Sequence, residues 1–159
     1  MKHLPKHIRP RWRYLAVGLE STPDAQLSRS TFQRDLWYAA QNLLGDAGSA
    51  DADCTVVRFD FDGGTGEAVV RARHGHTTQA RAALACLASV DGHDVGLHVR
   101  GISGTIRACE EKYLGRPSEA PTQRTVAFED EDRPAFVHDD VLDVRVDGRF
   151  VGATHLDFE

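Results

Sequence analysis

The stretch CTVVRFDFDGGTGEAVVRAR, residues 54–73, decides the fold of this chain. In its first half Val57, Phe59 and Phe61 alternate with polar side chains, which is the pattern of a half-buried β-strand. An Asp-Gly-Gly-Thr turn follows, and a second strand is expected over residues 66–73. Two such strands joined by a short glycine-containing turn predict an antiparallel β-hairpin at the centre of the fold.

The segments before the hairpin predict one strand and one helix. Residues 11–20 alternate apolar side chains with small or polar ones, as a strand does. Ser28 is a suitable N-cap for a helix whose apolar residues recur at helical spacing. Gly45 and Gly48 are expected to stop that helix.

The segments after the hairpin repeat this arrangement and add a third helix. Residues 76–90 predict a second helix, and an Asp-Gly pair at 91–92 turns the chain. Residues 93–101 alternate again as a strand. Ser103 is expected to cap a helix over residues 104–114.

The predicted order β-α-β-β-α-β is that of the ferredoxin-like sandwich, an α+β fold, with an extra C-terminal helix. Two helices are expected to cover one face of the sheet. The other face is left for a partner or for the third helix.

The last part of the chain differs from the first 115 residues. Residues 116–140 are rich in Pro, Glu and Asp and are expected to be a linker. Residues 141–154 predict a second hairpin through Asp147-Gly148. Because a lone hairpin is marginal in water, it is expected to dock on a sheet edge of this chain or of a partner. The chain is thus predicted to divide into a domain, 1–115, and an acidic extension, 116–159.

Charge is distributed unevenly along the 159 residues, whose formal net charge is −5. Residues 2–13 contain five Lys or Arg side chains and no acid. Residues 1–115 hold 14 basic and 13 acidic side chains, whereas residues 116–159 hold 5 and 11. A basic start on an acidic protein favours a nucleic-acid partner for the first part.

The sequence also indicates where the protein works. Sixteen Arg against three Lys, with abundant Asp, suits a protein in concentrated salt. No apolar run approaches the roughly 20 residues of a membrane span. The apolar run after the basic start is too short for a signal peptide, so a cytoplasmic location is expected.

No catalytic residue and no metal ligand is assigned to this chain. Asp60 and Asp62 are expected on one strand face, near His74 and His76 across the hairpin, where a carboxylate pair could hold Mg²⁺, but the sequence fixes no third carboxylate.

The three cysteines are widely spaced and form no CxxC pair. Cys54, Cys86 and Cys109 are therefore expected to be small buried apolar residues.

Two features favour contact with nucleic acid. The stretch GISGTIR, residues 101–107, places glycines and hydroxyls at a helix start, where free N–H groups can hold a phosphate, with Arg107 and Lys112 adding charge. The uncovered sheet face is expected to carry Trp12, Tyr14, Val56, Arg58, Val69, Arg71, Arg73, His98 and Arg100. Such a face can stack on single-stranded RNA or lie under a covering helix, and both readings stay open.

Three stretches together resemble one known family. They are LPKHIRPRWRYLAV at 4–17, SRSTFQRDLWYAA at 28–40 and VRGISGTIRACEEKYLG at 99–115. They are similar to the protein component 2 family of archaeal ribonuclease P, which is related to a eukaryotic RNase P/MRP subunit. The likeness spans roughly residues 2–115 and does not reach the extension.

This resemblance implies a non-catalytic protein subunit of the ribonucleoprotein that removes 5′ leaders from precursor tRNA. It implies that the RNA carries the active site and its Mg²⁺, and that this chain binds no cofactor. The implied partners are the RNase P RNA, the TIM-barrel-like component 3, the other RNase P proteins and, indirectly, precursor tRNA, with a dimer of heterodimers as one assembly. The candidate RNA-contacting residues are Lys2, Lys6, His7, Arg9, Arg11, Arg13, Ser103, Gly104, Thr105, Arg107 and Lys112.

Two other functions remain open from the sequence. One is a general RNA-binding module outside ribonuclease P. The other is a small-molecule regulatory domain of similar fold, which a ligand pocket between the sheet and the helices would favour.

Overall fold

The computed structural model describes residues 4–115, 122–138, 141–154 and 157. The chain forms two compact units that divide between Arg116 and Pro117. Each unit has its own sheet and its own apolar core.

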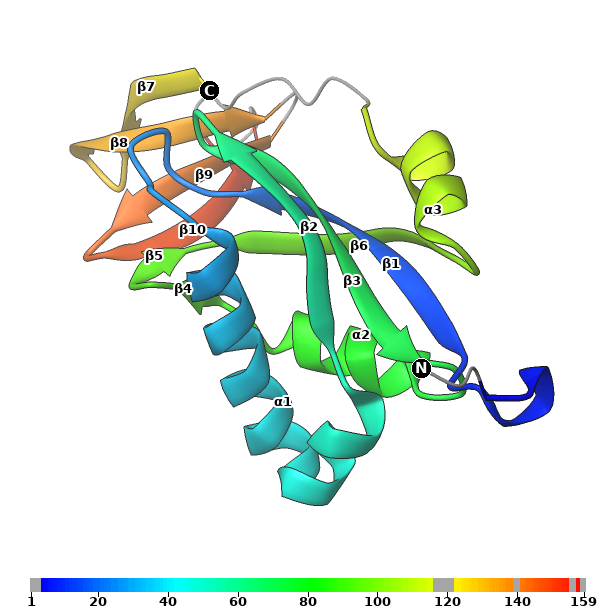
Figure 1. Cartoon of the computed structure of the whole chain (residues 1–159). Helices are drawn as coiled ribbons and strands as arrows, with labels where there is room; N and C mark the ends of the chain where they lie inside the picture. Colours follow the sequence, from blue (N-terminus) through cyan, green and yellow to red (C-terminus); the bar gives the residue numbers. More distant parts are fainter. Residues whose placement is uncertain (1–3, 116–121, 139–140, 155–156, 158–159) are drawn as a thin grey trace. The chain divides into compact units, whose positions relative to one another are not determined.

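The first unit is built on a four-stranded antiparallel sheet of order β2-β3-β1-β6 (Figure 1). In chain order its elements are η1 (Lys6–Ile8), β1 (Trp12–Glu20), α1 (Arg29–Ala52), β2 (Thr55–Asp62), β3 (Thr65–Arg73), α2 (Thr77–Ala85), β4 (Ser89–Val90), β5 (His93–Asp94), β6 (Gly96–Ser103) and α3 (Ile106–Tyr113). This is the predicted ferredoxin-like order, with α3 as the extra helix.

The main core lies between the sheet and the helices α1 and α2. Leu15, Val17 and Leu19 alternate onto this face of β1, and Phe32 and Leu36 meet them from α1. All five are at most 1% exposed. Full burial of one such side chain stabilises the fold by about 1.5–3 kcal/mol, so this layer supplies much of the unit's apolar stabilisation.

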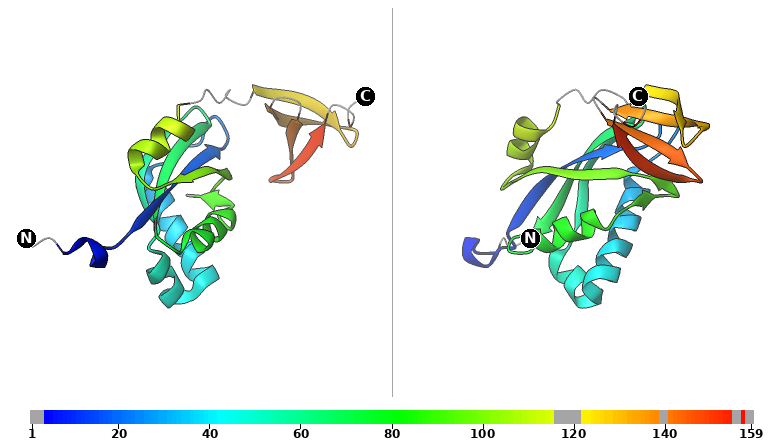
Figure 2. Two further views of the ribbon diagram at one scale, coloured as in Figure 1. Left: turned by 90° about the vertical axis from the view of Figure 1, so that its right-hand side faces the viewer. Right: turned by 180° about the vertical axis from the view of Figure 1, so that it is seen from behind.

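A second, smaller cluster lies on the opposite face of the sheet, under α3. Cys109 of α3 is buried against Ala16 of β1 and Val69 of β3, and Tyr113 packs beside them. The first unit therefore has three layers, with α1 and α2 on one side of the sheet and α3 on the other (Figure 2).

A β-bulge changes the predicted orientation of side chains at the start of β2. The pairing with β3 shifts between Val56 and Arg58. Because the bulge inserts one residue, Val56 turns into the main core and Val57 turns toward α3. The prediction that Val56 faces outward and Val57 inward was wrong for this reason.

Helix α1 begins as predicted and ends later than predicted. The Ser28 side chain accepts a hydrogen bond from the Thr31 N–H, and the Thr31 side chain accepts one from the Ser28 N–H, which completes a capping box. Gly45 is non-helical, with φ 72°, but the chain resumes the helix as far as Ala52. Gly45 thus kinks the helix instead of stopping it. Among the described residues, no helix is both long enough and apolar enough to cross a membrane.

The segment after α2 corrects another prediction. Residues 76–90 were expected to be one helix, but α2 ends at Ala85, and β4 pairs with β5 in a two-stranded ribbon. The carboxylate of Asp35 accepts the N–H of Asp91 at 2.8 Å and so fixes the turn of this ribbon. A hydrogen bond from Arg34 lowers the pKa of Asp35.

The start of one sheet edge is covered by side chains of α1. At the start of β2, the Gln33 amide donates to the Cys54 carbonyl at 3.2 Å and accepts the Val56 N–H at 2.6 Å. The Trp37 indole donates to the same Cys54 carbonyl at 3.0 Å. Arg29 Nε donates to the Val56 carbonyl at 2.9 Å. These three side chains occupy edge groups that an unpaired strand would expose.

The second unit is a four-stranded antiparallel sheet in the order β10-β9-β8-β7. Its strands are β7 (Thr122–Phe128), β8 (Glu131–His138), β9 (Val141–Val146) and β10 (Arg149–Thr154). The predicted hairpin through Asp147-Gly148 is present, and both turn residues have positive φ. It pairs through β9 with β8, so it docks on a sheet edge of this chain.

The linker predicted over 116–140 was wrong where the structure describes it, because residues 122–138 form β7 and β8. The acidic composition that suggested a linker is concentrated in their turn, where Glu129 and Asp130 adopt positive φ. Ala135 and Val144 are fully buried in the small core of this sheet. The prediction failed because an acidic turn without glycine has the composition of an irregular, solvated segment and lacks the usual signal of a hairpin turn.

Candidate nucleic-acid interface

The basic arm leaves the first unit at the start of β1 and stays exposed. Residues 4–11 are all exposed, and Lys6 and His7 lie on the short helix η1. Arg9 Nε donates to the Leu4 carbonyl at 2.5 Å, which holds the arm in a compact turn. Arg11 joins the arm to the sheet, since its carbonyl accepts the N–H of His74 at 2.8 Å. Lys2 lies outside the described residues.

One of the predicted basic residues, Arg13 of β1, lies beside the predicted phosphate-binding loop. β1 and β6 pair Tyr14 with Ser103, so Arg13 lies beside the end of β6. A Cβ placed on Gly104 would lie 3.5 Å from Arg13 Nη1. The guanidinium of Arg13 is thus a neighbour of the GISGT loop.

The start of α3 differs from the prediction. Ser103 is the last residue of β6, and Thr105 is the N-cap, its Oγ1 accepting the Ala108 N–H at 3.1 Å. Ser103 was predicted to be the cap, but the strand extends through it because it pairs with Tyr14. The cap therefore lies two residues later.

The cations of α3 have partners within the helix. Arg107 Nε forms an exposed ion pair with Glu111 at 2.8 Å, and Lys112 Nζ lies 5.3 Å from the centre of the Tyr113 ring. Contact of Arg107 or Lys112 with RNA stays a prediction, as it does for the other candidate residues.

Gly101 allows close packing of a helix on the sheet, a role that the sequence did not reveal. A Cβ at this position would overlap the Tyr113 ring, so the ring lies directly on the strand backbone. The first glycine of GISGT, Gly101, thus allows α3 to pack closely against the sheet.

Part of the predicted open sheet face is covered by α3, as the second of the two readings allowed. Arg58 pairs with Asp60 at 2.8 Å and with Glu110 of α3 at 3.2 Å. Arg100 pairs with Glu67, and the Glu67 carboxylate also accepts the Gly115 N–H just after α3. These arginines therefore anchor the helix.

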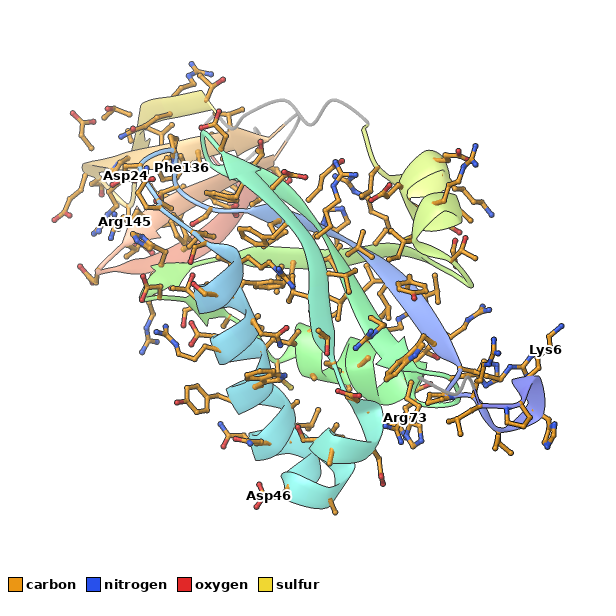
Figure 3. The ribbon with its side chains drawn as sticks, viewed as in Figure 1. Lys6, Asp24, Asp46, Arg73, Phe136 and Arg145 are labelled. Carbon is orange, nitrogen blue, oxygen red and sulfur yellow. The ribbon has the colours of Figure 1, made fainter. Side chains whose placement is uncertain are left out.

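The arginines at the end of the sheet from which the arm leaves behave differently. Within the described residues, Arg11, Arg13 and Arg71 form neither an ion pair nor a side-chain hydrogen bond. Arg71 and Arg73 lie 4.1 Å and 5.7 Å from the centre of the Trp12 ring, and Arg73 is also 3.7 Å from Asp53 (Figure 3 labels Arg73 and Lys6). The charges of Arg11, Arg13 and Arg71 are thus not paired with any described carboxylate.

The acidic hairpin turn does not meet the two histidines. Asp62 pairs with Thr65 at one end of β3, whereas His74 and His76 follow its other end. The expectation that they are near each other was wrong, since a nine-residue strand separates them. Within the described residues there is no group of three or more His, Cys, Asp or Glu side chains placed to hold a metal ion.

Two cysteines are buried as predicted and one is not. Cys54 and Cys109 are buried, whereas Cys86 is exposed just after α2. Burial raises the pKa of Cys54 to about 11 and also raises the pKa of Cys109. Cys86 is exposed because the helix ends before it.

Comparison with known proteins gives consistent matches. The sequence model described as the Rpp14/Pop5 family matches residues 13–114. A protein of Halorubrum lacusprofundi named "Ribonuclease P protein component 2" is 62% identical over 159 residues, 100% of both chains. One of the same name from Haloarcula marismortui is 63% identical, with 99% of each chain covered.

One relative of the same name is too short to contain the second unit. The Methanosarcina mazei protein of the same name is 37% identical over 114 residues, which are 72% of this chain and 93% of that protein. The remainder of that relative is too short to hold a counterpart of the second unit. The shared part therefore corresponds to the ferredoxin-like unit.

Proposed function

The chain belongs to the Rpp14/Pop5 family, and from that premise we propose that it is a protein subunit of ribonuclease P. Ribonuclease P is the endoribonuclease that generates tRNA 5′ ends. The observation that carries the proposal is identity of 62–63% over nearly the whole length to relatives named "Ribonuclease P protein component 2". The subunit works with RNA and with the other ribonuclease P components.

The finer assignment follows the family resemblance. The RNA holds the active site and its Mg²⁺, and this chain supports it without binding a cofactor. Its protein partner is component 3, a TIM-barrel-like subunit, and two such pairs join as a dimer of heterodimers. Precursor tRNA is contacted indirectly, and the complex works in the cytoplasm.

The geometry supports a role for the arm in contacting RNA phosphate. Lys6, Arg9 and Arg11 are exposed, and the Arg13 guanidinium lies beside Gly104. Lys and Arg that neutralise phosphates release counterions, which makes binding depend on salt. The predicted contacts at Ser103, Thr105, Arg107 and Lys112 would extend this surface along the start of α3.

The regulatory-domain alternative has little support. A pocket lined by Val17, Arg81, Leu84, Leu97 and His98, among others, lies between β6 and α2, and its volume is about 170 Å³. Small-molecule sites usually measure about 300–1,000 Å³, so this pocket is small for a regulatory ligand.

Reconstitution tests the proposed function. Cleavage of precursor tRNA is measured with the RNase P RNA and the other protein components, with this chain present or omitted. Omission is expected to slow 5′ maturation, and the chain alone with Mg²⁺ is expected to cleave nothing. Full activity without the chain, together with no co-purification of RNase P RNA or proteins, would contradict the assignment.

Neutralising the arm tests its part in that function. Replacing Lys6, Arg9 and Arg11 together with Gln is expected to weaken RNA association and leave the fold intact, because the arm precedes the sheet. Each lost phosphate contact is expected to lower the salt slope by about one. Unchanged affinity and slope would show that the arm does not touch RNA.

A further inference from the structure

The aromatic side chain that begins β1 holds two guanidinium groups of β3. Trp12 pairs with Arg73 in the antiparallel register, and Tyr14 pairs with Arg71. The Arg71 guanidinium carbon lies 4.1 Å from the centre of the Trp12 ring, and that of Arg73 lies 5.7 Å away. Both distances are within the range of a cation–π interaction, which fixes these flexible side chains in place.

Arg71 has hydrogen-bonding capacity that the described part of the chain leaves unused. Its Nε is buried and has no hydrogen-bond partner, and no described carboxylate forms an ion pair with it. A guanidinium that stacks on a ring through its face keeps its N–H donors at its edge. The N–H donors of the two Nη groups at that edge can bind two oxygens of a tetrahedral oxyanion such as phosphate.

The contrast with the rest of the unit strengthens this reading. Arg34, Arg58, Arg100 and Arg107 each form an ion pair with a carboxylate of the first unit. At the end of the sheet near the arm, Arg73 is paired with Asp53 at 3.7 Å, and Arg71 has no ion pair among the described residues. Each of these four arginines faces an acid, whereas Arg71 faces none among the described residues, so its guanidinium is available to an acidic ligand.

We propose that Trp12, Arg71 and Arg73 form a binding site for a backbone phosphate of RNA, on the side of the sheet that carries α3. The proposal rests on the proposed function, because the RNA of a ribonucleoprotein supplies the phosphate. In molar salt the Debye length is about 3 Å, so attraction acts only at contact. Guanidinium groups held on a ring at the end of a strand suit such binding better than the fully exposed side chains of the arm do.

The test uses the full chain assembled with the other RNase P proteins and labelled RNase P RNA. Affinity is measured over a series of KCl concentrations for the wild type, Arg71→Gln and Arg71→Lys. Arg81→Gln is the matched control, because Arg81 lies on α2, against the other face of the sheet. Thermal unfolding of each variant checks that the fold is retained.

Arg71→Gln is expected to raise the Kd about tenfold, the effect of one charge-assisted contact, and to lower the salt slope by about one. Arg71→Lys is expected to keep the slope and still lose affinity, since the charge remains but the planar donors are lost. Arg81→Gln is expected to match the wild type. A folded Arg71→Gln protein with wild-type affinity and slope would overturn the proposal.

The same experiment separates this proposal from the proposed function. Wild-type assembly together with an unaffected Arg71→Gln variant would refute the phosphate site alone. Failure of the wild type to associate with RNase P RNA or proteins would refute the function itself. If Arg71→Gln weakened only the association with another protein component, the site would be a protein interface and the proposal wrong.

Fluorescence provides an independent readout. The chain has two tryptophans, so Trp37→Phe leaves Trp12 as the reporter. Addition of RNA to the assembled Trp37→Phe protein is expected to reduce quenching of Trp12 by acrylamide. Unchanged quenching at saturating RNA would contradict contact at this site.

Discussion

Two regions of one sheet face carry arginines that have different partners. Under α3, Arg58 and Arg100 bind the carboxylates of Glu110 and Glu67 and hold the helix on the sheet. At the arm end of the same face, Arg71 and Arg73 stack on Trp12, away from the helix. The comparison teaches that residue type and strand position do not show which arginines of this face are paired with a carboxylate. The packed structure does, and it leaves Arg71 without such a partner among the described residues.

A substitution at Gly101, where Tyr113 of α3 packs on the strand backbone, is expected to have the largest effect on stability. Gly101→Ala places a methyl group where the Tyr113 ring lies, so the ring and α3 must shift. The free energy of unfolding is expected to fall by about 1–3 kcal/mol, as in other overpacked sites. Urea unfolding at high KCl measures it.

A glycine on the same strand provides the control. A Cβ on Gly96 would approach only the Glu20 Cβ, at 3.9 Å, so Gly96→Ala is expected to be tolerated. Equal stabilities of Gly101→Ala and Gly96→Ala would show that α3 does not depend on this close approach.

Removal of the Glu67 charge, which helps to hold α3 on the sheet, is expected to have a smaller effect on stability. Glu67→Gln takes the charge from a carboxylate that binds Arg100 and the Gly115 N–H. Because Arg100 is only 16% exposed, loss of its partner is expected to lower the free energy of unfolding by about 1–2 kcal/mol. Thermal unfolding measures the change.

The matched control is Glu111→Gln, which breaks the exposed Arg107 pair of the same helix. It is expected to change the free energy of unfolding by no more than about 0.5 kcal/mol, since exposed pairs contribute little. If both variants behaved alike, the Glu67–Arg100 pair would not be the anchor that we describe.

The arm end is expected to be the less sensitive region for stability. Trp12→Leu removes the ring under Arg71 and Arg73 and is expected to cost about 0.5–1 kcal/mol, the value of an exposed cation–π contact. The measurement is the same urea titration. A loss as large as that of Gly101→Ala would mean that the Trp12 cluster is structural, and the contrast between the two regions would disappear.

Thiol reactivity provides a further test of the comparison. At pH 8 the exposed Cys86 is expected to react readily with a thiol reagent, while Cys54 and Cys109 stay protected. Burial raises the pKa of both protected thiols, so little thiolate is present.

In a Cys86→Ser background, added Gly101→Ala is expected to expose Cys109 and leave Cys54 protected. Reaction of both at one rate would indicate global unfolding instead.

The sequence predicted the ferredoxin-like order because apolar periodicity and turn residues agree over most of the first unit. The hairpin at 54–73, the Ser28 cap and the Asp147-Gly148 turn each carry a local signal that the structure confirms. Errors occurred where tertiary contacts decide. The bulge at Val57 reverses two side chains, and a single inserted residue leaves no mark in the sequence pattern.

The candidate site was only partly visible in the sequence. The arm was evident from its composition, and the strand pattern placed Trp12, Arg71 and Arg73 on one face. The partners of the arginines were not predictable, because Glu67 and Glu110 meet them only after β3 and α3 pack together. Asp53 was missed as the neighbour of Arg73 for the same reason, since it follows the unpredicted last turn of α1.

The covered start of the β2 edge has a consequence for how this subunit can misassemble. A bare strand edge is a template on which another chain can add, and that addition begins aggregation and domain swapping. Here Arg29, Gln33 and Trp37 occupy the backbone groups of Cys54 and Val56. All three belong to one helix at intervals of four residues, so the protection is lost as a unit. We therefore expect the first committed step of intermolecular strand addition at this edge to be fraying of α1, and helix-stabilising substitutions there to delay it.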